Sequence, residues 1–273
     1  MAHHIDLRKC LNAISDVVNN RPHALREFDQ IFMKTADMLL QAEHVSRWFS
    51  GRRVVFIGDG DAIGLCLVHL HQRELLEHGP KSVHVLDFDE RVVLSVRGFA
   101  ARYGIADRVT AELYNVAFPL PVQHWRGYDG FYTNPPFGAS NDGRSIEAFL
   151  LRGFEAVTTN GIGCVVIADD REFPWTRSVL FSTQSYALSQ GFVISELVPE
   201  FHHYHLDDSP DLRSCSIALT CHTKRNDAYA SEALPKAYLD NFYGRNSPLR
   251  AKFVRDRTAG GKRPSNDHEI EPL

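Results

Sequence analysis

A short turn that carries two aspartates and two glycines could bind a positively charged ligand. Gly58-Asp59-Gly60-Asp61 follows a β-rich run and precedes a helical stretch, where nucleotide-binding folds place a glycine-rich turn. The carboxylates would repel a pyrophosphate but attract the sulfonium and ammonium of an S-adenosyl compound. The turn therefore predicts cofactor-binding residues at Gly58, Asp59 and Gly60. A structural role is the alternative, with Asp61 capping the helix and Asp59 complementing its dipole.

The strongest short motif is Thr133-Asn134-Pro135-Pro136-Phe137. The two prolines lack N–H donors, so the local carbonyls are left to accept from a ligand, and Asn134 adds a further acceptor. Phe137 offers a flat face to a cationic or planar group. The motif predicts an amine-binding site that includes Pro135, Pro136 and Phe137, and its alternative is a plain turn that ends a strand.

Polar side chains follow other β-rich runs. Asp87 is predicted to hold ribose hydroxyls, because a carboxylate at this position accepts two hydrogen bonds side by side, whereas Asp89 is expected to cap the next helix. Asn115 is a candidate for an adenine edge. Asp169 and Glu172 either line an acidic, substrate-binding pocket or lie in a solvated loop.

A histidine cluster in the C-terminal half of the chain is a candidate metal site. His202, His203 and His205 precede Asp207 and Asp208. Their spacing matches no helix-borne metal motif. We therefore predict no metal cofactor.

The alternation of β-rich and helical stretches predicts an α/β fold with a Rossmann-like, seven-stranded, mostly parallel sheet. Ligands of such sheets bind beyond the carboxyl ends of the strands, where the polar residues above lie. The predicted strands are 53–57, 82–86, 109–114, 130–133, 163–167, 192–197 and 215–220. The predicted helices are 5–19, 24–49, 63–77, 91–103 and 145–157.

Three segments are expected. Residues 1–50 form an N-terminal helical segment, 51–223 a Rossmann-like catalytic domain, and 224–273 a C-terminal extension. Residues 256–273 are rich in Gly, Lys, Pro, Asn and acidic residues, which predicts a flexible tail.

Composition restricts the partners and the compartment. The 273 residues have a formal net charge of -4, so no nucleic-acid partner is expected and small cationic partners fit better. The five widely spaced cysteines indicate reduced thiols. No apolar run is long enough for a membrane span and no secretion signal is evident, so we expect a cytoplasmic protein. The oligomeric state stays open, with a homodimer as one option.

The order of six short motifs resembles the branched-chain polyamine synthases, also called bis-aminopropyl spermidine synthases. The resemblance covers roughly residues 20–222. Its motifs are Arg21-Pro22 with Glu27-Phe28-Asp29-Gln30, Phe56-Ile57-Gly58-Asp59-Gly60-Asp61, Val85-Leu86-Asp87-Phe88-Asp89-Glu90-Arg91, Pro119-Leu120-Pro121, Thr133-Asn134-Pro135-Pro136-Phe137 and Arg213-Ser214-Cys215-Ser216.

The resemblance implies a class I methyltransferase-like fold that uses decarboxylated S-adenosylmethionine as co-substrate. Its aminopropyl group would pass to the central secondary amine of spermidine. The attacking nitrogen must lose a proton, and the resemblance places the carboxylate base in the acidic turn. Asp61 is the first candidate for the base and Asp59 the second. Asn134 is also expected to take part in catalysis and to bind the cofactor.

Two alternatives to aminopropyl transfer remain, an amino-group methyltransferase and a non-catalytic sensor. The family has an acid where Gly60 stands, and Asp and Tyr where Asn134 and Phe137 stand. Asn-Pro-Pro-Phe matches the motif of amino-group methyltransferases, which use intact S-adenosylmethionine on a nucleobase or another amine. The second alternative is a non-catalytic protein that senses polyamine or nucleotide.

Overall fold

The centre of the molecule is one seven-stranded sheet. The computed structural model describes residues 6–205, 212–224, 226–258 and 267–273. The strands are β1 (Arg53–Ile57), β2 (Ser82–Asp87), β3 (Val109–Leu113), β4 (Tyr128–Thr133), β5 (Val157–Ala168), β6 (Phe192–His203) and β7 (Arg213–Cys221). Their order is β3-β2-β1-β4-β5-β7-β6, and only β7 runs antiparallel to its two neighbours in this sheet. The predicted α/β fold with a mostly parallel sheet is confirmed.

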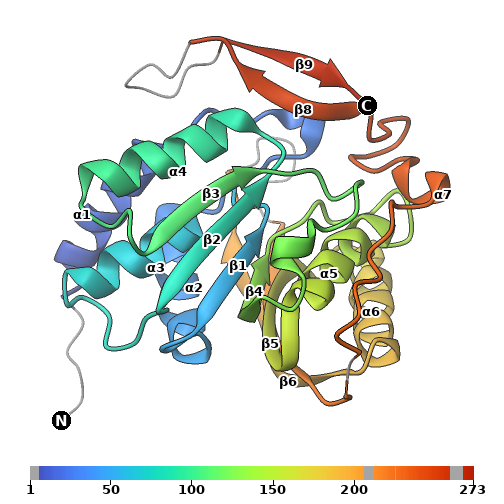
Figure 1. Ribbon diagram of the computed structural model, residues 1–273, viewed down its shortest axis with the longest axis horizontal. Coiled ribbons are helices and arrows are strands. Elements are labelled where there is room, and N and C mark those ends of the chain that lie inside the picture. The colour runs from blue at the N-terminus through green and yellow to red at the C-terminus, as the bar shows by residue number, and fades with distance from the viewer. Residues whose placement is uncertain (1–5, 206–211, 225, 259–266) are drawn as a thin grey trace.

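Helices cover both faces of the sheet (Figure 1). They are α1 (Leu7–Val18), α2 (Thr35–Trp48), α3 (Ile63–Gln72), α4 (Glu90–Arg102), α5 (Arg144–Ala156), α6 (Pro174–Ser189) and the short α7 (Lys236–Leu239). The first four pack on one face, and α5, α6 and α7 pack on the other. No helix in the described ranges combines the length and apolarity that crossing a membrane requires.

Alternate side chains of β1 enter different cores. Val54 and Phe56 belong to the core under α1–α4, whereas Val55 and Ile57 belong to the core under α5 and α6. Because successive side chains of a strand point to opposite faces, a strand covered on both sides must be apolar throughout. This explains why β1 is a continuous apolar run after Arg53.

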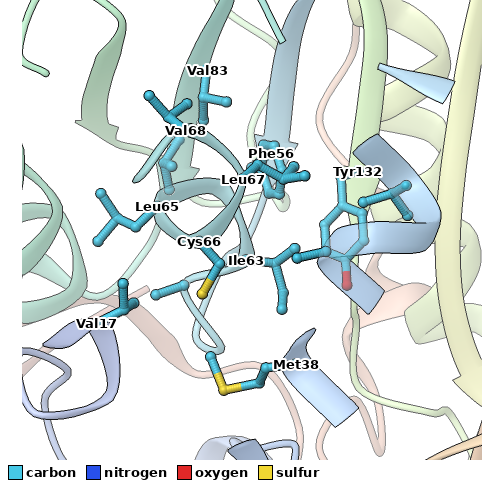
Figure 2. Close-up of a cluster of buried hydrophobic side chains, with 14 of the residues drawn as sticks. Val17, Met38, Phe56, Ile63, Leu65, Cys66, Leu67, Val68, Val83 and Tyr132 are labelled. Atoms are coloured by element: carbon cyan, nitrogen blue, oxygen red, sulfur yellow. The ribbon is translucent and has the colours of Figure 1, made fainter. Parts of the chain in front are cut away.

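Helix α3 is buried from Ile63 to Leu70. Figure 2 shows its side chains in one cluster with Val17 and Met38 from the N-terminal helices and with Phe56 and Val83 from the sheet. Each fully buried aliphatic side chain contributes about 1.5–3 kcal/mol. The packing therefore fixes the start of α3, and with it the acidic turn that connects β1 to this helix.

The segment before α2 differs from the prediction. A helix was expected over 24–49, but α2 begins only at Thr35, and residues 24–34 contain a short 3-10 turn at Arg26–Phe28 followed by extended chain. Here tertiary contacts override the apolar spacing. Met33 forms an isolated antiparallel bridge with Tyr204, and Asp29 adopts a left-handed conformation (φ 55°).

The C-terminal part also differs from the prediction. A flexible tail was expected from residue 256, but β9 (His268–Pro272) pairs antiparallel with β8 (Ala251–Asp256). Residues 259–266 of the predicted tail lie outside the described part. The hairpin lies beside α4 (Figure 1), and Val254 N–H donates to the carbonyl of Phe88. Helix α6 was not predicted either.

Candidate active site

A pocket opens beyond the carboxyl ends of β1, β2 and β4, which is the position predicted for a ligand of this kind of sheet. Its floor is the turn between β1 and α3. Ten of the residues predicted for the site line it: Gly58, Asp59, Gly60, Asp61, Asp87, Asn115, Asn134, Pro135, Pro136 and Phe137. Residues that were not predicted also line it: Phe28, Asp29, Gln30, Ile31, Phe32, Leu86, Phe88, Tyr114, Val116, Phe149, Tyr204 and Tyr243.

Asp59 is bound to the first turn of α3. Its carboxylate accepts hydrogen bonds from the N–H groups of Ile63 (2.8 Å) and Gly64 (3.0 Å). A side chain at Gly64 would place its Cβ only 2.9 Å from the Asp59 carboxylate, so the glycine makes this contact possible. The structural alternative predicted that Asp61 caps α3, but it is Asp59 that accepts from the first N–H groups of this helix. Burial raises the pKa of Asp59 well above its usual range.

The glycines of the turn serve different needs. Gly58 has a φ of +70°, which side chains other than glycine rarely adopt, and a Cβ there would approach Phe149 to 3.2 Å. Gly60 has no such conformation, and a Cβ would meet Phe32 at an ordinary 3.6 Å. The fold therefore requires glycine at position 58 but not at position 60.

Asp61 faces side chains on the opposite side of the turn. Asn134 donates its amide N–H to Asp61 Oδ2 at 2.7 Å, and the backbone N–H of Met33 donates to Oδ1 at 2.8 Å. Arg21 lies behind, with Nη1 3.6 Å from Oδ1 and its guanidinium over the ring of Phe32. Burial raises the pKa of Asp61, and the Arg21 charge partly offsets this rise.

Asn134 is the start of a buried hydrogen-bond chain. Its side chain interacts with the Tyr204 hydroxyl, which lies 2.7 Å from Ser214 Oγ. Ser214 Oγ is 2.9 Å from His202 Nδ1, and the other ring nitrogen of His202 is 2.9 Å from Gln41 Oε1. Because burial lowers the pKa of His202 to about 3, this histidine is neutral. The chain connects Asp61 to α2 through uncharged partners.

Asp87 and Asn115 are held by backbone groups. Asp87 accepts from the N–H groups of Asp59 (3.0 Å) and Asp89 (2.9 Å). Asn115 donates to the carbonyls of Ala251 and Lys252 and accepts from Ala117 N–H, so its side chain anchors β8. Burial, followed by the nearby Asp89, raises the pKa of Asp87 to about 7.

Asp89 caps α4, as expected from its position. It accepts from the Arg91 backbone N–H at 3.0 Å and pairs with the Arg91 guanidinium at 2.6 Å. Both side chains are buried. The ion pair fixes the loop that carries Asp87 and Phe88.

An aromatic cluster closes the Asp87 end of the pocket. Phe28 packs edge-on against Phe88 and Tyr243, with ring centroids 5.3 and 5.4 Å apart. Ala251 and Val254 of β8 pack against the same group. Flat apolar surfaces beside a carboxylate suit a nucleoside, whose base stacks while its sugar hydroxyls donate hydrogen bonds.

Some predicted residues lie elsewhere. Asp169 and Glu172 are not among the residues that line the pocket. Asp169 accepts from the N–H of Glu200 at 3.1 Å, and Glu172 is exposed. Of the histidine cluster, His202 belongs to the buried chain and His203 lies 3.5 Å from Asp37; Asp207 and Asp208 fall outside the described residues.

The pocket residues that sequence reasoning missed come from distant segments. Residues 28–30 fall within the family-like motifs, so motif order was a signal for them, although no role followed from it. Phe149, Tyr204 and Tyr243 carried no local signal. Residues from both sides of positions 50 and 223 line the pocket, so it extends beyond the segment 51–223 that was predicted as the catalytic domain.

The charge of the pocket lining is acidic. Asp29, Asp59, Asp61 and Asp87 contribute to it, and none of the described residues that line it is Lys or Arg. Arg21, the cation behind Asp61, is largely buried. A ligand that enters this pocket gains from carrying positive charge.

Comparisons with known proteins identify the family to which this sequence is similar. The model of the branched-chain polyamine synthase A C-terminal domain matches residues 9–256. The N(4)-bis(aminopropyl)spermidine synthase of Methanocaldococcus jannaschii is 26% identical over 152 residues, which cover 54% of this chain and 39% of that protein. The chain thus matches well under half the length of the curated relatives to which it is similar.

Solved structures show the same fold. The branched-chain polyamine synthase C9 mutein from Thermus thermophilus, in complex with N4-aminopropylspermidine and 5'-methylthioadenosine, superposes with a TM-score of 0.71 at 23% identity, covering 87% of this chain and 70% of that chain. A Pyrococcus horikoshii protein assigned as an RNA methyltransferase gives a TM-score of 0.58 at 14% identity, with 80% and 100% covered. The expected class I methyltransferase-like fold is confirmed.

Proposed function

The chain belongs to the branched-chain polyamine synthase family, and on this premise we propose that its pocket transfers an aminopropyl group from decarboxylated S-adenosylmethionine to an amine of a linear polyamine such as spermidine. The observation that carries the proposal is the acidic lining at the carboxyl ends of β1, β2 and β4. Both co-substrates are cations, and a buried carboxylate favours a cation more strongly than water does.

The reaction is a displacement at carbon. A neutral amine nitrogen attacks the carbon of the aminopropyl group next to sulfur, a C–N bond forms, and the C–S bond breaks with its electron pair left on sulfur. The products are the aminopropylated polyamine, 5'-methylthioadenosine and one proton. Holding the nitrogen in line with the departing sulfur supplies most of the rate enhancement, and removal of the proton supplies a smaller part.

We assign the proton to Asp61. The two carboxylate oxygens of Asp59 accept from backbone N–H groups of α3, so protonating Asp59 would weaken the start of that helix. Asp61 accepts from the Met33 backbone N–H on Oδ1 and from the Asn134 side chain on Oδ2, so one of its two oxygens is bound only by a side chain that a substrate amine can displace. Burial has also raised the pKa of Asp61, and this makes it a better base.

Each end of the pocket is proposed to bind a different co-substrate. We assign the nucleoside to the end with Asp87 and the aromatic cluster of Phe28, Phe88 and Tyr243, and the polyamine to the end with Asn134, the two prolines and Phe137. A donor without its carboxylate fits the acidic turn, because an intact donor would bring like charge to Asp59 and Asp61.

Product analysis by mass spectrometry tests this proposal. The purified protein is incubated with spermidine and either decarboxylated or intact S-adenosylmethionine. The proposal predicts successive additions of an aminopropyl mass with the decarboxylated donor and no product with the intact donor. A methyl addition with the intact donor alone would favour the methyltransferase suggested by Asn134-Pro135-Pro136-Phe137. Binding of both co-substrates without any product would overturn the proposal in favour of a sensor.

A further inference from the structure

We propose that His84, Glu112 and His124 form a binding site for a divalent transition-metal ion of the zinc class, separate from the pocket. They come from three elements: β2, β3 and the 3-10 turn η2 (Val122–His124). One ligand atom from each residue lies within 4.8 Å of the other two. Two imidazole nitrogens and one carboxylate oxygen are a donor set that zinc accepts.

The Nε2 atoms of both histidines lie near the carboxylate of Glu112. His124 Nε2 lies 3.0 Å from Glu112 Oε2, and His84 Nε2 lies 3.7 Å from Glu112 Oε1. Ligand atoms around a tetrahedral zinc are about 3.3 Å apart, given metal–ligand distances of about 2.0–2.1 Å. Because all three ligand atoms lie within 4.8 Å of one another, binding an ion requires them to move closer by at most about 1.5 Å.

Hydroxyl groups hold both rings in the orientation that a metal needs. His84 Nδ1 lies 2.7 Å from Thr110 Oγ1, and His124 Nδ1 lies 2.8 Å from the Tyr128 hydroxyl. In both residues the second nitrogen, Nε2, is thereby directed at Glu112. Metal-binding histidines are typically oriented in this way by a hydrogen bond to the other ring nitrogen.

One ring nitrogen is otherwise unexplained. His84 Nε2 is buried and has no hydrogen-bond partner in the described part of the chain, which is costly for a polar atom. A structural histidine pair would be expected to satisfy this atom. A metal ion between His84 and Glu112 would do so, and the half-exposed side chain of Glu112 gives the ion and a water ligand access.

The site lies outside the proposed catalytic machinery. His84 precedes the pocket residue Leu86 by two positions, and Glu112 precedes Tyr114 by two. None of the three proposed ligands lines the pocket. Because the ion would tie β2 and β3 to η2, we infer a stabilising role.

The test uses the full chain after removal of metal by a chelator and dialysis. We expect one Zn²⁺ per chain by elemental analysis, a higher melting temperature with Zn²⁺, and the visible absorption of tetrahedral Co²⁺ when Co²⁺ is supplied instead. Glu112→Gln and His84→Gln should weaken Zn²⁺ binding by about 100-fold or more, and Tyr128→Phe by about 10–100-fold, because it removes only an orienting hydroxyl.

His222→Ala is the matched control, since this histidine is exposed and distant in sequence; it should bind Zn²⁺ as the parent chain does. Equal Zn²⁺ affinity in the parent chain, Glu112→Gln and His84→Gln would overturn the proposal, as would no binding by the parent chain. Glu112→Gln changes a half-exposed side chain, so it keeps the test decisive if His84→Gln does not fold.

Discussion

The two ends of the pocket hold their polar groups in different ways. At the nucleoside end, Asp87 and Asn115 bind backbone N–H and carbonyl groups, and Asp59 beside them does the same. At the proposed amine end, Asp61 accepts from the Asn134 side chain on one oxygen and from the Met33 backbone N–H on the other, and Asn134 in turn contacts Tyr204. The difference is therefore that one oxygen of Asp61 is bound by a side chain, whereas both oxygens of Asp59 and of Asp87 are bound by backbone N–H groups.

The comparison teaches that two aspartates in one turn can have unlike tasks. Asp59 and Asp61 are two residues apart and both buried. Asp59 accepts from two N–H groups of the first turn of α3, while Asp61 accepts from the Asn134 side chain and the Met33 backbone, and we propose that a substrate amine replaces Asn134 there. Asp59 and Asp61 are almost equally buried, so burial does not distinguish them. They differ in their hydrogen-bond partners.

The largest expected effect is on turnover in Asp61→Asn. Removing a positioned base typically costs about 10²–10⁴-fold in rate. The substitution also leaves the largely buried Arg21 guanidinium without its carboxylate partner, so the melting temperature should fall as well, and rates are compared at a temperature at which the variant is folded. Initial rates of aminopropyl transfer measure the effect. A variant with unchanged rates would refute the assignment of Asp61.

The second prediction concerns the pH dependence of stability at the nucleoside end. The pKa of Asp87 is raised from 3.8 to about 7, so between these values the folded state keeps a proton that the unfolded state has lost. Its contribution to stability is full below pH 3.8 and is lost as pH rises through about 7, on the order of 2–4 kcal/mol.

Denaturant unfolding at several pH values compares the parent chain with Asp87→Asn, which cannot ionise there. The stability of the parent chain relative to the variant should fall between pH 4 and pH 7. A constant difference across this range would contradict the raised pKa.

Asp59→Asn should act on stability through the start of α3. Asparagine has one acceptor oxygen, so one N–H at the start of α3 loses its partner, and we expect a loss of about 1–2 kcal/mol in the free energy of unfolding. Chemical denaturation provides the measurement. If Asp59→Asn were fully stable but inactive, the capping and base roles would have to be exchanged.

The smallest effects are expected at the glycines. Gly58→Ala places a side chain at φ +70° against Phe149 and should cost about 1 kcal/mol or more. Gly60→Ala fits the space beside Phe32 and should change stability by less than about 0.5 kcal/mol. Melting curves of the two variants separate these cases, and equal losses would show that the turn is constrained at both glycines.

The strands of the central sheet could be predicted from the local spacing of apolar residues. All seven β-rich runs are strands. The inner strands β1 and β5 show the continuous apolar run of a strand buried on both faces, whereas the edge strands β3 and β6 are partly exposed and are recognised by their β-branched residues. Residues 24–34 were mispredicted because their apolar residues contact the pocket and Tyr204 instead of one helix face. Neither strand of the C-terminal hairpin, β8 or β9, was predicted. β9 is His268-Glu269-Ile270-Glu271-Pro272 and is largely exposed, so it has no apolar run that would indicate a strand.

The site was predictable only where polar residues directly follow strands. Asp59, Asp61, Asp87 and Asn134 carry that signal and line one pocket. Tyr204 lines the pocket and Arg21 lies behind Asp61. Both come from segments far away in the chain, so only the folded structure brings them to Asn134 and Asp61. Asp169 also follows a strand, but it follows β5, which ends away from the pocket lining.

The most direct test of the division of the pocket is calorimetric binding of 5'-methylthioadenosine and of spermidine, each alone, to the parent chain, Asp61→Asn and Asp87→Asn. The account predicts that Asp61→Asn weakens spermidine binding by about tenfold or more and leaves 5'-methylthioadenosine binding nearly unchanged, and that Asp87→Asn does the reverse. Equal losses for both ligands in either variant, or no loss for spermidine in Asp61→Asn, would contradict it.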